Sequence, residues 1–383
     1  MPRPPQPVPD VAGIADAIYS PFADAVRPER VFPLHVGDTW LEPFEGGRVE
    51  DLRSKDHAGL HRYTDTRGIP ELVDGIVEKV RARNGLECER ESVLVTGGAT
   101  AGLAASVGAL VSPGEEVLIL APFWPLIRGI VRTFRGTPVE VPFYDRVDSP
   151  DAAVEAIRER LSERSVALYV STPSNPTGRV LPESWLVALA ELARRENLWL
   201  ISDEVYEELV YRGEHVSIGR LAPERTVTAF SFSKTYGMAG YRTGYLTGPP
   251  ATVAQIRKVA THTVYSAPTP GQLAGLRAIR EGGTWLDRAR ELYRKAGQDA
   301  ARTLGLASPE GSTFLFLDVE PVLDERGLPG LLSDCFEDGV LVAPGGSGGD
   351  AYASWIRLCF TSCPPDETAE AVRRLARRVI RAG

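Results

Sequence analysis

The chain has 383 residues, of which 43% are hydrophobic and 25% are charged, and its formal net charge at pH 7 is -8. A chain of this length is longer than a single hydrophobic core usually accommodates, so we expect two domains. An acidic chain without a basic block is unsuited to nucleic acid or to an anionic membrane surface, and no apolar run approaches the roughly 20 residues of a membrane span.

Helical and strand patterns alternate along most of the chain. The first predicted helix is 11–27, and a short predicted strand at 31–36 ends at Gly37. Further helices are predicted at 69–83, 99–110, 125–134, 152–163 and 183–196, from about 271 onward, and at 367–380. Further strands are predicted at 92–96, 116–120, 138–142, 166–171, 198–202, 226–231, 244–247, 314–319, 340–342 and 355–360.

The predicted strands in the middle of the chain are continuous apolar runs, such as V-L-I-L, V-A-L-Y-V and L-W-L-I. Such runs indicate an α/β fold with a mostly parallel central sheet, buried on both faces by flanking helices. We predict a leader and the N-terminal part of a small domain in residues 1–45, a large domain in 46–275, and a smaller α+β C-terminal domain in 276–383. Ligands of such sheets bind beyond the carboxyl ends of the strands.

The first ten residues, M-P-R-P-P-Q-P-V-P-D, contain no apolar signal core, so we expect a cytoplasmic protein. The four cysteines form no C-x-x-C pair and have no histidine at ligand spacing. We therefore expect reduced thiols and no metal site.

The run S-F-S-K-T-Y-G-M-A-G-Y-R, residues 231–242, follows a predicted strand and places Lys234 among serines, glycines and an arginine. A catalytic lysine usually condenses with a carbonyl to form a Schiff base. Ser231 and Arg242 suit a phosphate, which guanidinium geometry matches well. Taken alone, Lys234 is more often a solvated surface lysine.

Asp203 ends another predicted strand, in I-S-D-E-V-Y. A buried acid at such a place needs a cationic or hydrogen-bonded partner, and a pyridinium nitrogen would be one. Tyr206 lies three residues further on and would contact the same ligand. The alternative is a helix N-cap by Asp203 with Tyr206 as packing, and the two residues alone do not exclude it.

Three further strand ends carry suitable groups. Asn175 stands in the rigid turn S-T-P-S-N-P-T-G and presents an amide, although a plain turn asparagine is the simpler interpretation. In V-T-G-G-A-T-A-G, the backbone amides of Gly98, Ala99 and Thr100 at a helix start would cup a phosphate. Trp124, in A-P-F-W-P, would stack on a flat ring or fill the core.

Each of these signals is modest, but one phosphorylated, positively charged aromatic aldehyde would use them all. Two other enzyme classes fit less well. A serine hydrolase with Ser231 and Lys234 as S-x-x-K lacks the companion S-D-N and K-T-G elements. A dehydrogenase using T-G-G-A-T-A-G would need an acid at the end of a ribose-binding strand about 20 residues later, and no acid ends a strand there.

The chain resembles the class I/II aminotransferase family of fold-type I pyridoxal-phosphate enzymes from Gly37 to the C-terminal helix. The resemblance rests on S-N-P-T-G, S-D-E-V-Y, S-x-S-K with Arg242 eight residues after the lysine, and the late R-L of W-I-R-L-C-F. It implies pyridoxal 5'-phosphate as the cofactor and a large domain that binds it. By position, the implied cofactor contacts are Ala99, Thr100, Trp124, Asn175, Asp203, Tyr206, Ser231, Lys234, Arg242 and Tyr63.

Among these, the resemblance implies that Lys234 is the aldimine lysine and the acid–base group, and that Tyr63 reaches the phosphate across a homodimer interface. Gly37, Asn175 and Arg357 are the implied substrate contacts, with Arg357 on the α-carboxylate. The implied reaction moves an amino group from an L-amino acid to a 2-oxo acid in two half-reactions. A C–S lyase or a cyclase on the same fold is the alternative.

Three departures from the family pattern concern the substrate side chain. A glycine-rich stretch at 344–349 replaces the usual aromatic residue, Trp40 is added near the N-terminal strand, and His262 falls where aspartate-specific relatives carry an arginine. We therefore expect a roomier or less anionic side-chain pocket, for an aromatic or specialised substrate.

Overall fold

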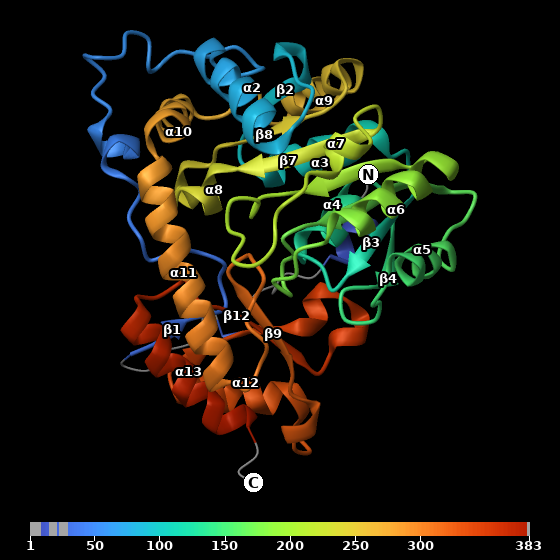
Figure 1. Ribbon diagram of the computed structural model, residues 1–383, viewed down its shortest axis with the longest axis vertical. Helices are drawn as coiled ribbons and strands as arrows, with labels where there is room; N and C mark the ends of the chain where they lie inside the picture. Colours follow the sequence, from blue (N-terminus) through green and yellow to red (C-terminus); the bar gives the residue numbers. More distant parts are fainter. Residues whose placement is uncertain (1–8, 15–20, 23–29, 381–383) are drawn as a thin grey trace, which may run out of the picture.

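A seven-stranded sheet dominates the computed structural model, which describes residues 9–14, 21–22 and 30–380 (Figure 1). The strand order is β2-β8-β7-β6-β5-β3-β4, and every pair is parallel except those that β8 makes with β2 and β7. The strands are β2 Val93–Thr96, β3 Glu116–Ala121, β4 Thr137–Pro142, β5 Ser165–Ser171, β6 Trp199–Asp203, β7 Thr226–Ser231 and β8 Gly244–Thr247. The predicted mostly parallel sheet is confirmed.

Helices cover both faces of this sheet, which is why its central strands are apolar throughout. Successive residues of β3 point to opposite faces. Val117 and Ile119 belong to the core under α3, α4 and α9, whereas Leu118 and Leu120 belong to the core under α5, α6 and α7. These helices are α3 Ala99–Leu110, α4 Leu126–Thr133, α5 Pro150–Arg158, α6 Glu183–Arg195, α7 Ile218–Leu221 and α9 Pro250–Thr263.

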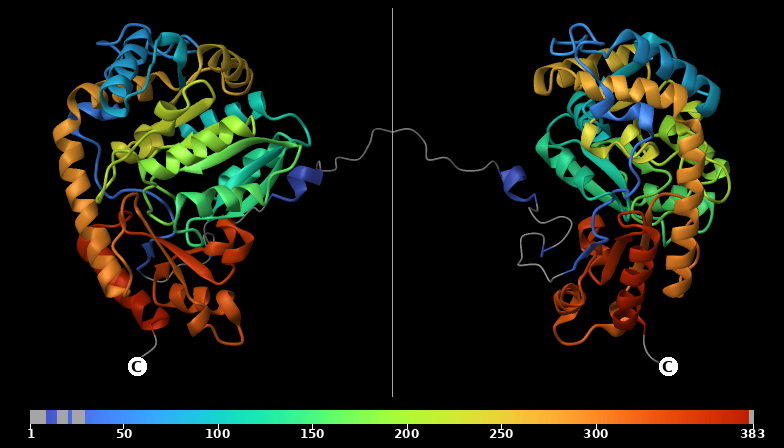
Figure 2. Two further views of the ribbon diagram at one scale, coloured as in Figure 1. Left: turned by 45° about the vertical axis from the view of Figure 1, so that its right-hand side comes forward. Right: turned by 90° about the vertical axis from the view of Figure 1, so that its left-hand side faces the viewer.

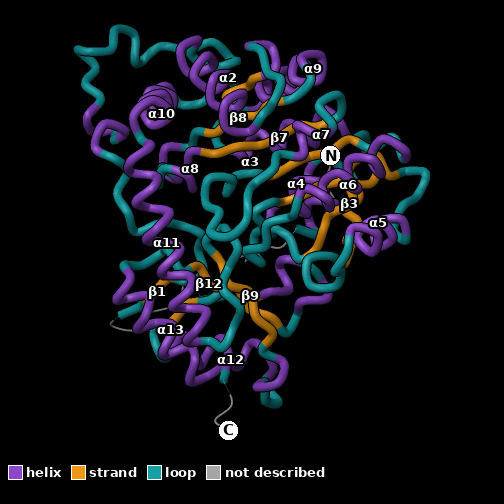
Figure 3. The backbone as a smooth tube through the Cα atoms, in the orientation of Figure 1, coloured by secondary structure: helices purple, strands orange, loops and turns teal. Residues whose placement is uncertain are grey.

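The β2–β8 end of the sheet is covered by α2 Pro70–Asn84 and α10 Thr269–Glu281, which contact each other. The short helix α8 Phe232–Thr235 directly follows β7 and carries Lys234. Figure 3 shows the strands of the sheet running between these helices. The carboxyl ends of β5, β6 and β7 therefore open toward one edge, where the chemistry was expected.

A second, smaller region contains a three-stranded antiparallel sheet in the order β11-β12-β9. Its strands are β9 Phe314–Asp318, β11 Ala343–Pro344 and β12 Trp355–Cys359, and its helices are α12 Gly327–Glu337 and α13 Pro365–Val379. The long helix α11 Gly283–Thr303 starts beside α10 and reaches α13, so it connects the two regions along one side (Figure 2).

The N-terminal part of the described chain joins this C-terminal region. Strand β1 Phe32–Pro33 pairs in parallel with β10 Val340–Leu341, and the Cys359 amide donates to the Leu34 carbonyl at 2.7 Å. Residues 35–38 then run from this small sheet toward the carboxyl ends of the large one. Segments from the two ends of the sequence thus meet at the site.

Three predicted elements differ in the structure. Much of the predicted helix 11–27 lies outside the described residues; α1 Pro9–Ala12 is helical, and described residues 13–14 and 21–22 are turns or bends. The predicted strand 31–36 shortens to β1, since Pro33 has no N–H for a ladder. The single helix predicted from 271 is two helices, α10 and α11, which meet at Gly282, and α9 and α12 were not predicted.

No described helix combines the length and hydropathy that crossing a bilayer requires. All four cysteines are buried and none forms a disulfide.

Candidate active site

A cavity of about 180 Å³ lies where β5, β6 and β7 end and α3 begins. The structure brings nine of the predicted residues to its wall: Ala99, Thr100, Trp124, Asn175, Asp203, Tyr206, Ser231, Lys234 and Arg242. Five further lining residues were not predicted: Leu103, Leu126, Val205, Ser233 and Ala239. The convergence of groups that lie 143 positions apart in sequence, from Ala99 to Arg242, supports the predicted site geometry.

Asp203 ends β6 and is buried at the floor of this cavity. Its Oδ2 accepts a hydrogen bond from the Tyr169 hydroxyl at 2.6 Å, and its Oδ1 accepts a long one of 3.4 Å from the Val205 amide. Burial raises the pKa of Asp203 to about 6, and these hydrogen bonds oppose the rise. A cation placed at Oδ1 would therefore be strongly favoured.

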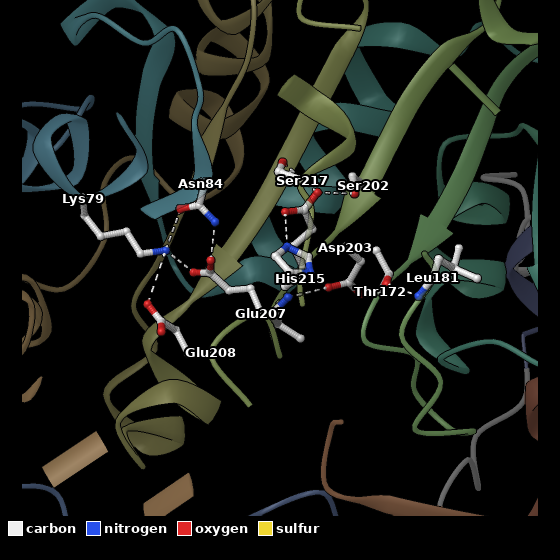
Figure 4. Close-up of polar contacts among 12 residues, drawn as sticks. Lys79, Asn84, Thr172, Leu181, Ser202, Asp203, Glu207, Glu208, His215 and Ser217 are labelled. Carbon is white, nitrogen blue, oxygen red and sulfur yellow. Dashed lines mark hydrogen bonds and ion pairs between the residues drawn. The ribbon is translucent and has the colours of Figure 1, made fainter. Parts of the chain in front are cut away.

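The turn after Asp203 is held by two buried networks of polar side chains (Figure 4). The fully buried Glu204 carboxylate contacts the Ser202 and Ser217 hydroxyls at 2.8 and 3.0 Å and His215 Nε2 at 2.9 Å. The second network joins Glu207 to α2 through Lys79 and Asn84. Tyr206, which stands between Glu204 and Glu207 in the sequence, is buried, and its ring meets Phe314 edge-on at 5.8 Å between centroids. The side chain of Tyr206 is thus fixed by its surroundings.

Lys234 stands in α8 with its Nζ donating to the carbonyl of Gly37. Burial lowers the pKa of Lys234 from its usual value, although the nearby charge of Asp38 acts in the opposite direction. A Cβ at Gly37 would lie 2.5 Å from the Phe314 ring, so only glycine allows this close approach. An amine with a lowered pKa is more readily neutral and hence nucleophilic.

Arg357 points from β12 toward the same space and is buried. Its Nη1 donates to Asn175 Oδ1 at 3.1 Å and its Nη2 to the His35 carbonyl at 2.7 Å. The guanidinium also lies over the Phe314 ring, 4.5 Å from its centroid. The fork is therefore held in one plane, which suits bidentate binding of a carboxylate.

The opposite end of the cavity is formed by the start of α3. Gly98 has φ +83 and precedes the helix, and a Cβ there would overlap the Arg242 guanidinium. The first amides of a helix, here those of Ala99 and Thr100, have no intrahelical acceptor. Ser231 lies alongside and caps α8 by accepting from the Ser233 amide at 3.0 Å. Amides, a hydroxyl and a guanidinium together suit a phosphate.

Four predicted residues do not line this cavity within the single chain. Gly37 and Arg357 contact residues of its wall, Lys234 and Asn175 respectively, whereas Tyr63 and His262 lie elsewhere. Tyr63 is 85% exposed and packs against Tyr265 at 4.8 Å between ring centroids. His262 is exposed near the end of α9, where its Nδ1 lies 2.8 Å from the Lys258 carbonyl oxygen.

The glycine-rich stretch serves close packing between the two regions. A Cβ at Gly345 would lie 2.6 Å from Trp355, and one at Gly348 would lie 2.8 Å from the Phe123 carbonyl. The Gly348 carbonyl accepts from the Phe123 amide at 2.8 Å. The missing aromatic side chain thus leaves room for this contact beside Trp124.

Taken together, the residues fit pyridoxal 5'-phosphate. A phosphate cradle at α3, a lysine in the cavity wall, an acid whose Oδ1 has only a long hydrogen bond and an indole are the groups that this cofactor needs. Tyr169 was not predicted as a site residue. The one sequence feature that could have indicated it is a tyrosine within an apolar strand, because a buried tyrosine hydroxyl usually has a hydrogen-bond partner.

Comparison with known proteins gives a consistent result. The family model for aminotransferase class I and II matches residues 30–375. An aspartate/prephenate aminotransferase of Thermus thermophilus is 35% identical over 337 residues, covering 85% of each chain. An arginine–pyruvate transaminase of Pseudomonas aeruginosa is 32% identical over 384 residues, covering 96% of this chain and 94% of the relative. The structure of aspartate aminotransferase from Thermus thermophilus with maleate superposes with a TM-score of 0.83 at 32% identity, covering 91% of each chain.

Proposed function

Since this chain belongs to the class I and II aminotransferase family and is a pyridoxal-phosphate-dependent transaminase, we propose that the cavity around Lys234 is where it exchanges an amino group between an amino acid and a 2-oxo acid. The observation that carries the assignment is the convergence of nine expected cofactor residues on one cavity at the carboxyl ends of the sheet. Nothing in the relatives or the structure favours the lyase or cyclase alternative.

We propose that Lys234 anchors the cofactor and afterwards carries the proton. Bound pyridoxal phosphate supplies a carbonyl carbon for amines and a protonated ring that accepts electrons from the substrate Cα. When Nζ of Lys234 is not holding the cofactor, it would serve as a base beside the substrate Cα. The lowered pKa of Lys234 lets Nζ remove the Cα proton and deliver it elsewhere on the same face.

We propose that the remaining groups bind and orient. Asp203 holds the ring nitrogen in its protonated form, and Asn175 and Tyr206 hydrogen-bond the 3-oxygen. Trp124 stacks on the ring. The phosphate lies against Ser231, Arg242 and the amides of Ala99 and Thr100. The support is the position of each group on the cavity wall.

Arg357 is the proposed partner of the substrate α-carboxylate, with Asn175 and the Gly37 carbonyl at its sides. The contacts of Arg357 with Asn175 and His35 fix the guanidinium plane before substrate arrives. A carboxylate held by this fork would place Cα between the fork and Nζ of Lys234. Proton transfer then needs no large movement of either side chain.

We propose an amino donor with an uncharged, bulky side chain. In the cavity wall the described cations are Lys234 and Arg242, and both have cofactor roles. An adjoining cavity of about 270 Å³ shares Thr100 and Leu126 with the first. Its wall includes two arginines, and both already have acceptors: Arg128 contacts Glu140 and Asp350, and Arg132 donates to the Gly13 carbonyl. A donor screen tests this: neutral aromatic or branched donors should exceed aspartate and glutamate, and the reverse order would contradict it.

We also propose a homodimer and the domain division given above. The seven-stranded sheet lies wholly within 93–247, which supports a large domain at 46–275. The exposed Tyr63–Tyr265 pair supports an interface that takes Tyr63 to the partner's phosphate site. Mixing Tyr63→Ala and Lys234→Ala chains tests it. Mixed dimers would regain one intact site and thus activity, whereas no gain on mixing would contradict the crossing tyrosine.

The reaction itself is tested with purified protein and pyridoxal phosphate. An amino acid alone should bleach the visible absorbance of the bound cofactor once, and a 2-oxo acid should restore it. Continuous product formation without a 2-oxo acid would instead indicate a lyase. Lys234→Ala is the control, and it should bind the cofactor without the characteristic absorbance.

A further inference from the structure

The Tyr169 hydroxyl makes a hydrogen bond to Asp203 that has no role in the function proposed so far. Tyr169 lies in the middle of β5 and Asp203 at the end of β6, and both side chains are buried. The hydroxyl donates to Oδ2 at 2.6 Å, a short distance typical of a bond to a charged acceptor. The other hydrogen-bond donor to this carboxylate among the described residues, the Val205 amide, is 3.4 Å from Oδ1. The hydroxyl is therefore the strong protein partner of Asp203.

Burial works against the ionised form of this acid. It raises the pKa of Asp203 to about 6, and the hydrogen bond from Tyr169 is the largest influence in the opposite direction. The pKa of Tyr169 is itself raised well above its usual value, first by burial and then by the charge of Asp203. The shared proton therefore stays on the tyrosine, and the carboxylate keeps its charge.

We propose that Tyr169 is a positioning residue that acts through Asp203: it keeps the carboxylate ionised and commits Oδ2, so that Oδ1 alone faces the cofactor ring nitrogen. The inference rests on the proposed role of Asp203. The other titratable groups that affect this carboxylate or are affected by it lie on the neighbouring elements: Tyr144, Glu204, Tyr206 and Lys234.

The test compares Tyr169→Phe with Tyr144→Phe. Tyr144 is an equally buried tyrosine at the same edge, and its hydroxyl donates to the Ser171 carbonyl at 2.5 Å instead of to Asp203. Each variant loses one hydroxyl; Tyr169→Phe loses the bond to Asp203, and Tyr144→Phe loses two bonds, to the carbonyl and from the amide of Ser171. Their thermal unfolding midpoints show whether the structural costs match.

Two ligands are titrated against each apoprotein: pyridoxal phosphate and its analogue in which a C–H group replaces the ring nitrogen. Tyr169→Phe should weaken pyridoxal phosphate about tenfold at neutral pH, the factor that corresponds to one pKa unit, and leave the analogue within about twofold. Tyr144→Phe should change both ligands equally. The phosphate titrates near pH 6 in both ligands, so the ratio of the two affinities isolates the ring nitrogen.

The pH dependence gives the second readout. Protonation of Asp203 removes its attraction for the ring cation, so the affinity ratio falls as pH drops through the pKa of this acid. In Tyr169→Phe that fall should occur at higher pH, because the acid loses its hydrogen bond. Replacing Tyr169 by a more acidic fluorinated tyrosine should shift the fall to lower pH, and this variant preserves the packing if the phenylalanine variant does not fold.

Equal weakening of both ligands by Tyr169→Phe, or an unshifted pH profile, would overturn the inference while leaving the proposed function intact. Failure of the wild-type protein to bind pyridoxal phosphate would instead overturn the proposed function. A wild-type protein that binds both ligands equally would show that Asp203 does not contact the ring nitrogen.

Discussion

Replacing Arg357 by lysine tests the substrate end of the site. The guanidinium keeps its plane through hydrogen bonds to Asn175 at 3.1 Å and the His35 carbonyl at 2.7 Å, and through its position over Phe314. Lysine retains the positive charge but offers a single point of contact where arginine offers a fork. The variant therefore separates geometry from charge.

The expected magnitude follows from the loss of one of two charge-assisted hydrogen bonds to the substrate carboxylate. Such a bond contributes about 1.5–3 kcal/mol, so kcat/KM for an amino acid should fall about 10- to 150-fold. The affinity for pyridoxal phosphate should change little, because Arg357 does not line the cofactor cavity. The buried Asn175 would also lose a donor, which makes the upper half of the range the more reasonable expectation.

The assay measures kcat/KM for one amino acid and for the amine that lacks its α-carboxylate. In wild type the amino acid should be strongly preferred, and in Arg357→Lys the preference should shrink by the same factor of about 10 to 150. A fall that is equal for the acid and the amine would refute the reasoning, since it would show damage to the site at large. So would a preference that does not change.

Three further predictions concern the cofactor end and the buried charges. Gly98→Ala places a side chain at φ +83 and against Arg242, so unfolding should become easier by about 1–2 kcal/mol and cofactor affinity should fall, as calorimetry and dialysis would show. Lys79→Met leaves the Glu207 carboxylate, whose side chain is 7% exposed, without its cation and should cost about 3–5 kcal/mol in urea unfolding. Burial lowers the pKa of His215 but Glu204 raises it more, to above its ordinary 6.5. The stability lost in His215→Gln should thus be full below pH 6.5 and should vanish as pH rises through the raised pKa.

Each of these three has an outcome that contradicts it. An unchanged cofactor affinity in Gly98→Ala would show that the Arg242 guanidinium moves aside freely. A loss below about 1 kcal/mol in Lys79→Met would mean that water reaches the carboxylate. A pH-independent loss in His215→Gln would mean that the histidine is neutral and acts by packing alone.

Much of the large sheet was predictable because its central strands obey one strong physical rule. Both faces of β3 are buried, so the run E-V-L-I-L-A is apolar throughout its interior and ends where the sheet ends. The break at Gly282 does not follow from burial and was missed. The apolar periodicity continues across it, and the one local signal, the pair Gly282 and Gly283, was not used although such a pair marks a turn.

The cavity was predictable where residues follow strands, because parallel strands bring their carboxyl ends together. Lys234, Asp203 and Asn175 were found for this reason. Tyr169 was missed because it lies inside a strand, where a tyrosine in an apolar run indicates only burial. Val205 was missed because a valine is equally common in a cavity wall and in a hydrophobic core. Only the tertiary structure shows which of the two positions it occupies.

The meeting of the two chain ends in the small sheet has a consequence for synthesis on the ribosome. Every residue that lines the cofactor cavity precedes 243, and the large sheet is complete at Thr247, whereas Arg357 follows 110 residues later on β12. At about 5–20 residues per second, that interval lasts on the order of ten seconds. The residues that bind the cofactor would thus be synthesised before Arg357, which binds the substrate. Residues 32–33, which form β1, must also remain unpaired until their partner strand β10 has been synthesised.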